Sequence, residues 1–281
     1  NEVTEKATQW IQKQRQPYFA FVHYFDAHFP YTPTENLYDP DYKGMIDGSD
    51  AVLRPYRDGA KTPSARDLEH VLALYDAEIT ELDAKIAPIL RLADENTTVV
   101  VTSDHGESFS HEYYFNHRAG LWDEITHVPL LISHSKEAKI FQQVGLIDLL
   151  PTVLDLAGLP KDERMQGESK VTLLEGEGTG REDVYSITDP WMKNPQFAVR
   201  SNQFKWIQSN QGDLFYALGQ DPYEMVSFKS VPKEFQPKQK QYMDVIAAMK
   251  EWQVEPPQKR NISDEECKKL MLLGYTTCEK P

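Results

Sequence analysis

Residues 97–107 read TTVVVTSDHGE, a β-branched run that ends in a carboxylate and an imidazole. Valine and threonine favour extended backbone, so residues 97–102 are predicted to form a short buried strand. In an open α/β sheet, ligands bind beyond the carboxyl ends of the strands, and Asp104 and His105 follow directly there. A carboxylate beside an imidazole suits a divalent cation. The alternative is a capped turn that binds nothing.

Helical patterns flank this strand on both sides. Residues 68–91 keep one face apolar, and Ser64 with Asp67 forms a capping pair before them. A shorter amphipathic helix is predicted over residues 2–14, and another helix is predicted to follow Asp148, whose side chain would cap it. Helices that alternate with strands indicate an α/β fold.

Two further apolar runs are short enough to be strands. Residues 18–25 read YFAFVHYF, and residues 128–132 read VPLLI. Their aromatic and β-branched content predicts buried strands, which we expect to be parallel because helical patterns lie between them. The polar, Pro- and Tyr-rich stretch at residues 30–62 is too long for a tight connection and is predicted to lie over a surface or a cleft.

The pattern changes after residues 175–180, EGEGTG, which have the composition of a linker. We therefore expect residues 1–174 and 181–281 to be separate parts. In the second part, short polar turns separate β-rich runs, which is typical of an antiparallel meander, and a helix is predicted over residues 239–252. The four strands of the meander are predicted at residues 184–187, 197–200, 204–208 and 214–218.

The composition is that of an acidic globular protein. The 281 residues include 30 Lys and Arg against 44 Asp and Glu, a formal net charge of −14, which argues against non-specific nucleic-acid binding. The longest apolar runs are far below the roughly 18 residues that a membrane span needs, so no membrane span is expected. Residues 1–20 do not form a secretory signal, which leaves a processed chain as an alternative. Cys267 and Cys278 could pair near the end of the chain.

Further residues that could carry chemistry lie in two places. His28 follows the run at residues 18–25, and His111, His117 and Arg118 lie in the loop after the Asp-His-Gly-Glu segment. The histidine of that segment, His111, His117 and Arg118 form a positive island in an acidic chain, which suits an oxyanion. The alternatives are a packed, hydrogen-bonded histidine at position 28 and a solvated loop around the others.

Several blocks of the sequence resemble consecutive blocks of the sulfatase family in order and spacing. They are residues 18–31, YFAFVHYFDAHFPY, residues 98–132, TVVVTSDHGESFSHEYYFNHRAGLWDEITHVPLLI, residues 145–160, GLIDLLPTVLDLAGLP, residues 197–208 and 213–224, and residues 262–275. The resemblance implies an α/β fold with an alkaline-phosphatase-like sheet sandwiched by helices and a smaller C-terminal antiparallel-sheet subdomain. Residues 1–174 would belong to the catalytic domain and residues 181–281 to the subdomain.

The same resemblance assigns roles to individual residues. Asp104 and His105 match the second pair of metal ligands of the family, with histidine in place of the commoner asparagine. His28 matches the histidine that faces the sulfate and the leaving oxygen, to which it would give a proton. His117 matches the lysine or histidine that contacts sulfate. The remaining candidates, treated as substrate contacts, are His111 and Arg118.

One large part of the family pattern is missing from this sequence. Sulfatases carry an early strand with two metal-binding aspartates and then a C-x-P-S-R or S-x-P-S-R segment, whose Cys or Ser becomes formylglycine. Residues 61–66, KTPSAR, resemble that segment only superficially and lack the nucleophile. We therefore expect this chain to be the C-terminal part of a sulfatase, with formylglycine on an N-terminal sulfatase polypeptide that completes the active site.

The resemblance implies a sulfuric ester hydrolase in a secreted, periplasmic or lysosomal setting, acting on a sulfate ester such as a sulfated glycan. The divalent cation is usually calcium in this family, but an imidazole ligand leaves manganese and zinc open. One alternative is a phosphate or phosphonate ester hydrolase or transferase of the same superfamily. The other is a non-catalytic remnant that binds sulfated glycans or a partner chain.

Overall fold

The computed structural model describes residues 2–15, 17–133, 137–188, 194–251, 263 and 267. The chain forms two compact units, Asn1–Lys233 and Glu234–Pro281. All candidate site residues lie in the first unit. The expected division into residues 1–174 and 181–281 stays a prediction.

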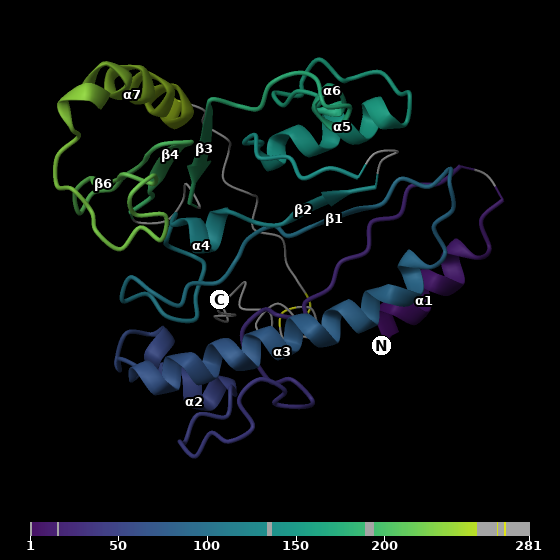
Figure 1. Cartoon of the computed structure of the whole chain (residues 1–281), viewed down its shortest axis with the longest axis horizontal. Coiled ribbons are helices and arrows are strands. Elements are labelled where there is room, and N and C mark those ends of the chain that lie inside the picture. The colour runs from purple at the N-terminus through teal and green to yellow at the C-terminus, as the bar shows by residue number, and fades with distance from the viewer. Residues whose placement is uncertain are drawn as a thin grey trace. The chain divides into compact units, whose positions relative to one another are not determined.

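The longest helix is α3 (Ala65–Leu90), and its predicted cap is confirmed. Ser64 Oγ accepts a hydrogen bond from the Asp67 amide at 3.1 Å and donates one to the Asp67 carboxylate at 2.7 Å. The shorter helix α1 (Glu2–Ile11) is also confirmed and ends three residues earlier than expected. It packs along α3 (Figure 1), where Thr4 Oγ1 donates to the Lys85 carbonyl at 2.9 Å.

Residues 30–62 contain a short helix, α2 (Asp50–Arg57), that the sequence did not predict. An ion pair between Asp50 and Arg54 spans one helical turn. Leu53 is fully buried and belongs to a hydrophobic cluster with Tyr31 and Phe115. This stretch therefore contributes to a core as well as covering a surface.

The first sheet differs from the prediction. Strands β1 (Val100–Thr102) and β2 (Leu130–Ile132) are confirmed, but they pair antiparallel, with Val100 opposite Ile132. The parallel arrangement was wrong because parallel neighbours need a crossover connection. Residues 103–129 instead connect the two strands through loops and the single turn of α4 (Asp123–Thr126).

The strand predicted at residues 18–25 was also wrong. These residues have an extended path, but no described strand forms a ladder with them. Phe19 is 72% exposed and Phe21 is 80% exposed. An apolar run becomes a buried strand only where neighbouring strands and helices cover it, and the described residues provide no such cover.

The helix after Asp148 is confirmed, although its predicted cap is not. The chain forms η1 (Leu146–Asp148), α5 (Leu149–Leu156) and α6 (Val171–Leu174). The carboxylate of Asp148 does not cap α5. It instead accepts hydrogen bonds from Arg181 Nε at 2.6 Å and from the Glu168 amide at 2.9 Å. The same carboxylate also accepts a hydrogen bond from the Gly145 amide at 3.2 Å, at the start of η1, so it serves the preceding turn and a later segment but not α5.

The antiparallel meander is confirmed in order and direction (Figure 1). Its core includes Val199, Trp206 and Phe215, which are at most 2% exposed. Gly212, with φ +118°, lies in the turn before the last strand, where a residue with Cβ would be strained. The strands are β3 (Asp183–Ile187), β4 (Phe197–Ser201), β5 (Lys205–Gln208) and β6 (Leu214–Tyr216).

The second unit contains the other predicted helix. After η2 (Lys233–Phe235), α7 (Gln236–Glu251) confirms the helix expected over residues 239–252 within the described part of the chain. Cys278 and most of residues 262–275 lie outside the described residues, so their predicted pairing and similarity are not addressed by the structure. Among the described helices, none is both long and apolar enough to cross a membrane.

Candidate active site

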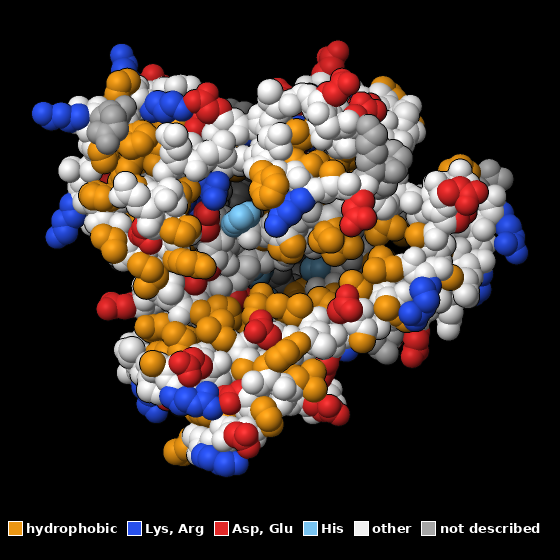
Figure 2. Space-filling model, viewed as in Figure 1, with side chains coloured by type: hydrophobic (Ala, Val, Ile, Leu, Met, Phe, Trp, Pro, Cys, Tyr) orange, Lys and Arg blue, Asp and Glu red, His pale blue; other side chains and the backbone are white. Residues whose placement is uncertain are grey.

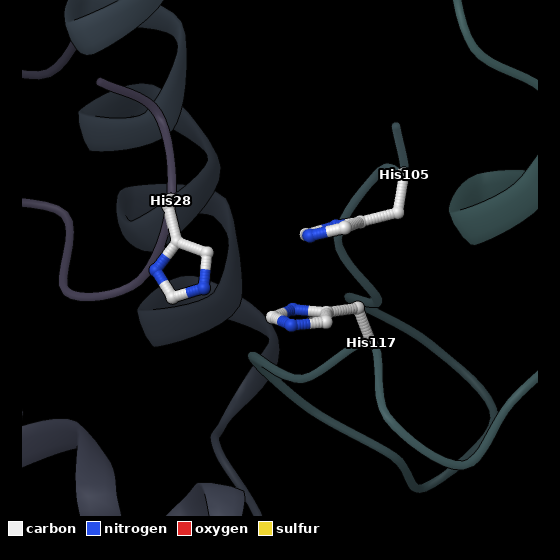
Figure 3. Close-up of side chains that lie close together, drawn as sticks. All are labelled: His28, His105 and His117. Atoms are coloured by element: carbon white, nitrogen blue, oxygen red, sulfur yellow. The ribbon is translucent and has the colours of Figure 1, made fainter. Parts of the chain in front are cut away.

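Three of the predicted site histidines come together in space (Figure 3). His28 lies in the loop before α2, His105 follows β1, and His117 lies in the long loop between β1 and α4. One ring nitrogen of each lies within 4.8 Å of one ring nitrogen of the others. The rings of His105 and His117 are stacked with centroids 3.8 Å apart, and His28 lies 5.0 Å from His117. We refer to these residues as the three-histidine cluster.

Every ring of the three-histidine cluster is anchored through Nδ1. The partners are the Phe29 carbonyl for His28 at 2.7 Å, the Gly106 carbonyl for His105 at 2.8 Å and the Glu107 carboxylate for His117 at 2.9 Å. Carbonyls and carboxylates only accept hydrogen bonds, so the hydrogen is assigned to Nδ1 in each ring. Each neutral ring then presents the lone pair of Nε2.

His28 is the most constrained member of the cluster. Burial lowers the pKa of its imidazole, and the neighbouring His117 and His105 act in the same direction, while the Phe29 carbonyl and Glu107 oppose them. Its Nε2 is buried and has no hydrogen-bond partner among the described residues. A buried unpaired polar atom is costly, which makes this nitrogen a candidate for contact with a ligand.

A buried carboxylate positions His117. Glu107 is 4% exposed, and besides accepting from His117 it accepts a hydrogen bond from the hydroxyl of fully buried Tyr31 at 2.8 Å. Burial, helped by the charge of Glu107, raises the pKa of Tyr31 well above its usual value, so this hydroxyl remains a donor. The roles of Tyr31 and Glu107 were not predicted from the amino-acid sequence. The only available signal was a carboxylate two residues after His105.

One face of α3 holds the loop that carries His28. Glu78 accepts hydrogen bonds from the Ala27 amide at 3.1 Å and from the Thr32 amide at 2.7 Å. Lys85, which lies seven residues after Glu78 on the same helix, forms an ion pair with Asp26. Burial raises the pKa of Glu78 to about 7. Residues seven apart share a helical face, but nothing in the sequence says which loop lies against that face.

Asp104 lies at the edge of the cluster. Its side chain is 65% exposed, and its Oδ2 is 3.8 Å from His105 Nε2. Its Oδ1 accepts a hydrogen bond from the His105 amide at 3.1 Å. The structure therefore places the carboxylate beside the imidazole nitrogen that would face a cation. The metal-binding role of the pair stays a prediction.

The turn that carries His105 packs closely against α4. The Gly106 amide donates to the Ile125 carbonyl at 2.7 Å. A Cβ added at Gly106 would lie 2.1 Å from the Glu124 carbonyl oxygen, so only glycine allows this approach. α4 is therefore part of the framework that positions His105.

The two candidate substrate contacts lie outside the three-histidine cluster. His111 stacks on Trp122 with ring centroids 4.5 Å apart, and Trp122 Nε1 donates to the Tyr216 hydroxyl at 3.0 Å. Burial lowers the pKa of His111. Arg118 is an exposed residue of the same loop. Their roles stay predictions.

Comparisons with known proteins were made on the whole sequence and on the fold. The profile described as "Sulfatase" matches residues 1–159, and the profile described as "N-sulphoglucosamine sulphohydrolase, C-terminal" matches residues 110–257. The chain is 26% identical over 252 residues to an "Ulvan-active sulfatase" from Formosa agariphila, which covers 82% of this chain and 48% of that protein. The chain spans between about a third and a half of the length of the curated relatives it matches.

Solved structures extend the comparison to the fold. A phosphonate monoester hydrolase from Silicibacter pomeroyi superposes with a TM-score of 0.67 at 18% identity, over 94% of this chain and 63% of the other. The structure described as BT4656 in complex with its substrate D-glucosamine-2-N,6-O-disulfate superposes with a TM-score of 0.50 at 25% identity, over 80% of this chain and 51% of the other. The expected alkaline-phosphatase-like α/β fold is thereby confirmed. With a sulfatase profile matching more than half of its residues, the chain belongs to the sulfatase family.

Proposed function

We propose that this chain is the C-terminal part of a sulfuric ester hydrolase. The observation that carries the proposal is the convergence of His28, His105 and His117 beyond β1 in a member of the sulfatase family. Imidazoles with free Nε2 atoms can bind an anion when protonated and a cation when neutral. In this assignment residues 1–174 are catalytic and residues 181–281 form the smaller subdomain.

The proposed roles divide the site between an anion and a cation. His28 and His117 contact the sulfate group, and His28 in its protonated form gives a proton to the departing alcohol. Asp104 and His105 hold the cation, and His111 and Arg118 contact the rest of the substrate. Glu107 holds His117 in one orientation, and Glu78 holds the loop of His28.

The donors in this chain can be compared with the cation that the family implies. A bound divalent ion would neutralise the non-bridging oxygens of sulfate. Calcium takes six to eight oxygen ligands, whereas the described cluster offers three imidazoles and the carboxylate of Asp104. These donors fit zinc or manganese by themselves. Calcium at Asp104 would need oxygen ligands from elsewhere.

The chain does not supply formylglycine. Cys267 and Cys278 are followed by KKL and EKP, and neither lies in a C-x-P-S-R segment. We place the nucleophile on an N-terminal sulfatase polypeptide that completes the active site.

Figure 2 shows hydrophobic side chains gathered around a hollow that has histidine atoms on its floor. Exposed Phe19, Phe21 and Leu131 are surfaces that such a polypeptide would cover.

The proposed substrate is a sulfate ester, with sulfated sugars as the first class to test. The structurally similar BT4656 has D-glucosamine-2-N,6-O-disulfate as its substrate. A secreted, periplasmic or lysosomal setting is proposed with it. The second candidate is phosphonate ester hydrolysis, favoured by the imidazole of His105 beside Asp104 in place of an amide ligand.

The test is an assay of the intact protein that contains this chain together with its N-terminal part. Sulfate release from an aryl sulfate and from a sulfated glucosamine is compared with hydrolysis of a phosphonate monoester, each with calcium, manganese or zinc supplied. We expect sulfate release that His105→Ala abolishes and that the surface variant His127→Ala leaves intact. Preferential phosphonate hydrolysis would favour the second candidate. Absence of both activities would contradict a catalytic role.

A further inference from the structure

The loop at residues 103–122 carries both His105 and His117, whose rings stack on one another from two parts of this loop (Figure 3). The loop lies between β1 and α4 and contains no helix or strand of its own. Its shape therefore depends on hydrogen bonds that its backbone and side chains make with other groups. Several of those bonds go to two consecutive residues of α4, Glu124 and Ile125.

The carboxylate of Glu124 binds three successive residues of the loop. Its Oε1 accepts hydrogen bonds from the hydroxyls of Ser108 and Ser110, the second at 3.0 Å. Its Oε2 accepts one from the Phe109 amide at 3.1 Å. Hydrogen bonds to an ionised acceptor are roughly twice as strong as neutral ones, so this half-buried carboxylate fixes the segment firmly.

The position of Ser108 fixes the backbone that leads to His117. The Ser108 amide donates to the Asn116 carbonyl at 3.0 Å, and the Ser108 carbonyl accepts from the Phe115 amide at 2.6 Å. Ser108 is fully buried, so water does not compete for these bonds. Its neighbour Glu107 holds the ring of His117 through Nδ1. Both the backbone and the ring of His117 thus depend on where Ser108 lies.

The other side of the histidine stack is held by the next residue of α4. The Ile125 carbonyl accepts a hydrogen bond from the Gly106 amide at 2.7 Å. The Gly106 carbonyl accepts one from His105 Nδ1 at 2.8 Å. His105 is therefore fixed through the backbone of Ile125, and His117 through the side chain of Glu124.

α4 is anchored firmly enough to serve as a reference for both rings. Asp123, the residue before Glu124, donates its amide to the carboxylate of Glu224, and its own carboxylate lies 2.7 Å from Lys205 Nζ. Glu224 and Lys205 are at most 2% exposed. A side chain can position a loop only if its own backbone is held in place, and the meander provides that support.

We propose that Glu124 is a positioning residue that holds His117 against His105. It acts through its hydrogen bonds to residues 108–110 and does not touch the substrate or the cation. The inference rests on the proposed function, in which His105 holds the cation and His117 contacts the sulfate. It adds the group that sets the separation of these two histidines.

Two substitutions separate the hydrogen bonds of Glu124 from its charge. Alanine removes all three bonds. Glutamine can keep them, because its carbonyl can accept from the Phe109 amide while its amide group donates to the hydroxyls of Ser108 and Ser110, which also act as acceptors. We therefore expect Glu124→Ala to release the loop and Glu124→Gln to retain it. The control is Glu112→Ala, which removes an exposed carboxylate from the same loop.

The experiment reads the histidine rings by NMR and, separately, the rate of sulfate release. The intact protein, with its N-terminal part, is prepared with isotope-labelled histidine. The nuclear Overhauser effect between the rings of His105 and His117 should be present in the wild type and lost in Glu124→Ala. His28 should keep its Nδ1–H tautomer, because Glu78 on α3 holds its loop. Sulfate release should fall roughly 10²-fold in Glu124→Ala, the cost of a misplaced reacting group, and stay close to the wild-type rate in the other two variants.

Three results would overturn the inference. The first is persistent contact between the two rings in Glu124→Ala, whatever the rate. The second is a wild-type rate although the rings have separated. The third is a loss in Glu124→Gln as large as in Glu124→Ala, which would assign the effect to the charge.

Circular dichroism and thermal melting check that each variant folds. Glu124→Asp, whose shorter side chain cannot reach all three donors, replaces an alanine variant that does not fold and must show the same loss of ring contact. If the wild type releases no sulfate, the proposed function fails, and the NMR comparison still decides whether Glu124 positions His117.

Discussion

Glu107 is the residue whose contacts link the core to the site. It accepts one hydrogen bond from buried Tyr31 and one from His117. A carboxylate has two acceptor oxygens, so it can serve both donors, whereas an amide presents one acceptor and one donor group. The orientation of His117 therefore depends on a negative charge buried beneath it.

We expect Glu107→Gln to destabilise the protein and to release His117. One of the two donors loses its acceptor, which costs roughly 1–3 kcal/mol in the free energy of unfolding. Urea unfolding measures that cost, and heteronuclear NMR of the histidine rings should show His117 in a mixture of tautomers. Glu112→Gln, an exposed carboxylate in the same loop, is the control. A single unchanged tautomer of His117 in Glu107→Gln would refute the positioning role.

His28 carries the second prediction at this scale. In the complete enzyme, His28→Ala should lower turnover by roughly 10²- to 10⁴-fold, the usual range for a lost general acid. The loss should be smaller for a nitrophenyl sulfate, whose leaving group needs no proton, than for an alkyl sulfate. Rates on both substrates measure this difference. Equal losses would mean that His28 holds the anion and does not protonate the leaving group.

At the scale of elements, α3 makes the loop of His28 sensitive to pH. Burial raises the pKa of Glu78 to about 7 from 4.5, so the folded protein holds this proton more tightly than the unfolded chain does. The stabilisation from protonated Glu78 is complete below about pH 4.5 and is lost as the pH rises through about 7. The full shift corresponds to roughly 3 kcal/mol, and solvent screening at this partly exposed group reduces it to roughly 1–2 kcal/mol.

The measurement compares the free energy of unfolding of the wild type and Glu78→Gln from pH 5 to pH 8. We expect the free energy of unfolding of the wild type to fall, relative to that of Glu78→Gln, by roughly 1–2 kcal/mol as the pH rises. The variant has no titratable group at position 78. Glu69→Gln, exposed on the same helix, should parallel the wild type throughout. A constant difference between the wild type and Glu78→Gln would contradict the assignment.

A buried ion network connects α4 with the meander. Lys205 is 1% exposed and lies 2.7 Å from Asp123 and 3.3 Å from Glu224. Arg200 Nε also donates to Asp123 at 2.8 Å. Because α4 packs against Gly106, this network supports the turn that carries His105.

We expect Lys205→Met to lower the free energy of unfolding by roughly 3–5 kcal/mol, since it leaves Glu224 buried without its cation. Urea unfolding of Lys205→Met and of the exposed control Lys229→Met measures the difference. If the two variants are equally stable, the network contributes nothing to the framework of the site.

At the scale of the whole molecule, the exposed apolar surface predicts a partner. Phe19, Phe21 and Leu131 are 60–80% exposed, and large apolar side chains that gather on a protein surface often mark a contact. We expect the chain to co-purify with an N-terminal sulfatase polypeptide and to self-associate when that polypeptide is removed. Sedimentation and thermal melting test this, with Phe19→Ser and Phe21→Ser combined to reduce self-association. A monomeric chain that melts cooperatively with nothing bound would refute the expectation.

Local signals in the amino-acid sequence determined most of the elements by themselves. The cap and apolar face of α3 lie within a few residues of one another, as do the polar turns between the strands of the meander, so neither needs tertiary information. The family was also recognisable, because whole blocks around Asp104 and His28 keep their order. The candidate histidines could be chosen at this level, but their mutual distances could not.

Tertiary structure decided how strands pair and how the site is held. An isolated run such as residues 18–25 does not reveal whether a neighbouring strand exists, and the direction of β2 depends on the path of a long loop. Glu78 meets Ala27 across 51 residues and Tyr31 meets Glu107 across 76. Asp148 could cap its own helix but pairs with Arg181, 33 residues away. Tertiary packing determines these partners, because it brings a distant charged group or amide closer to the side chain than a local group. The periodicity of the sequence does not predict which distant group that is.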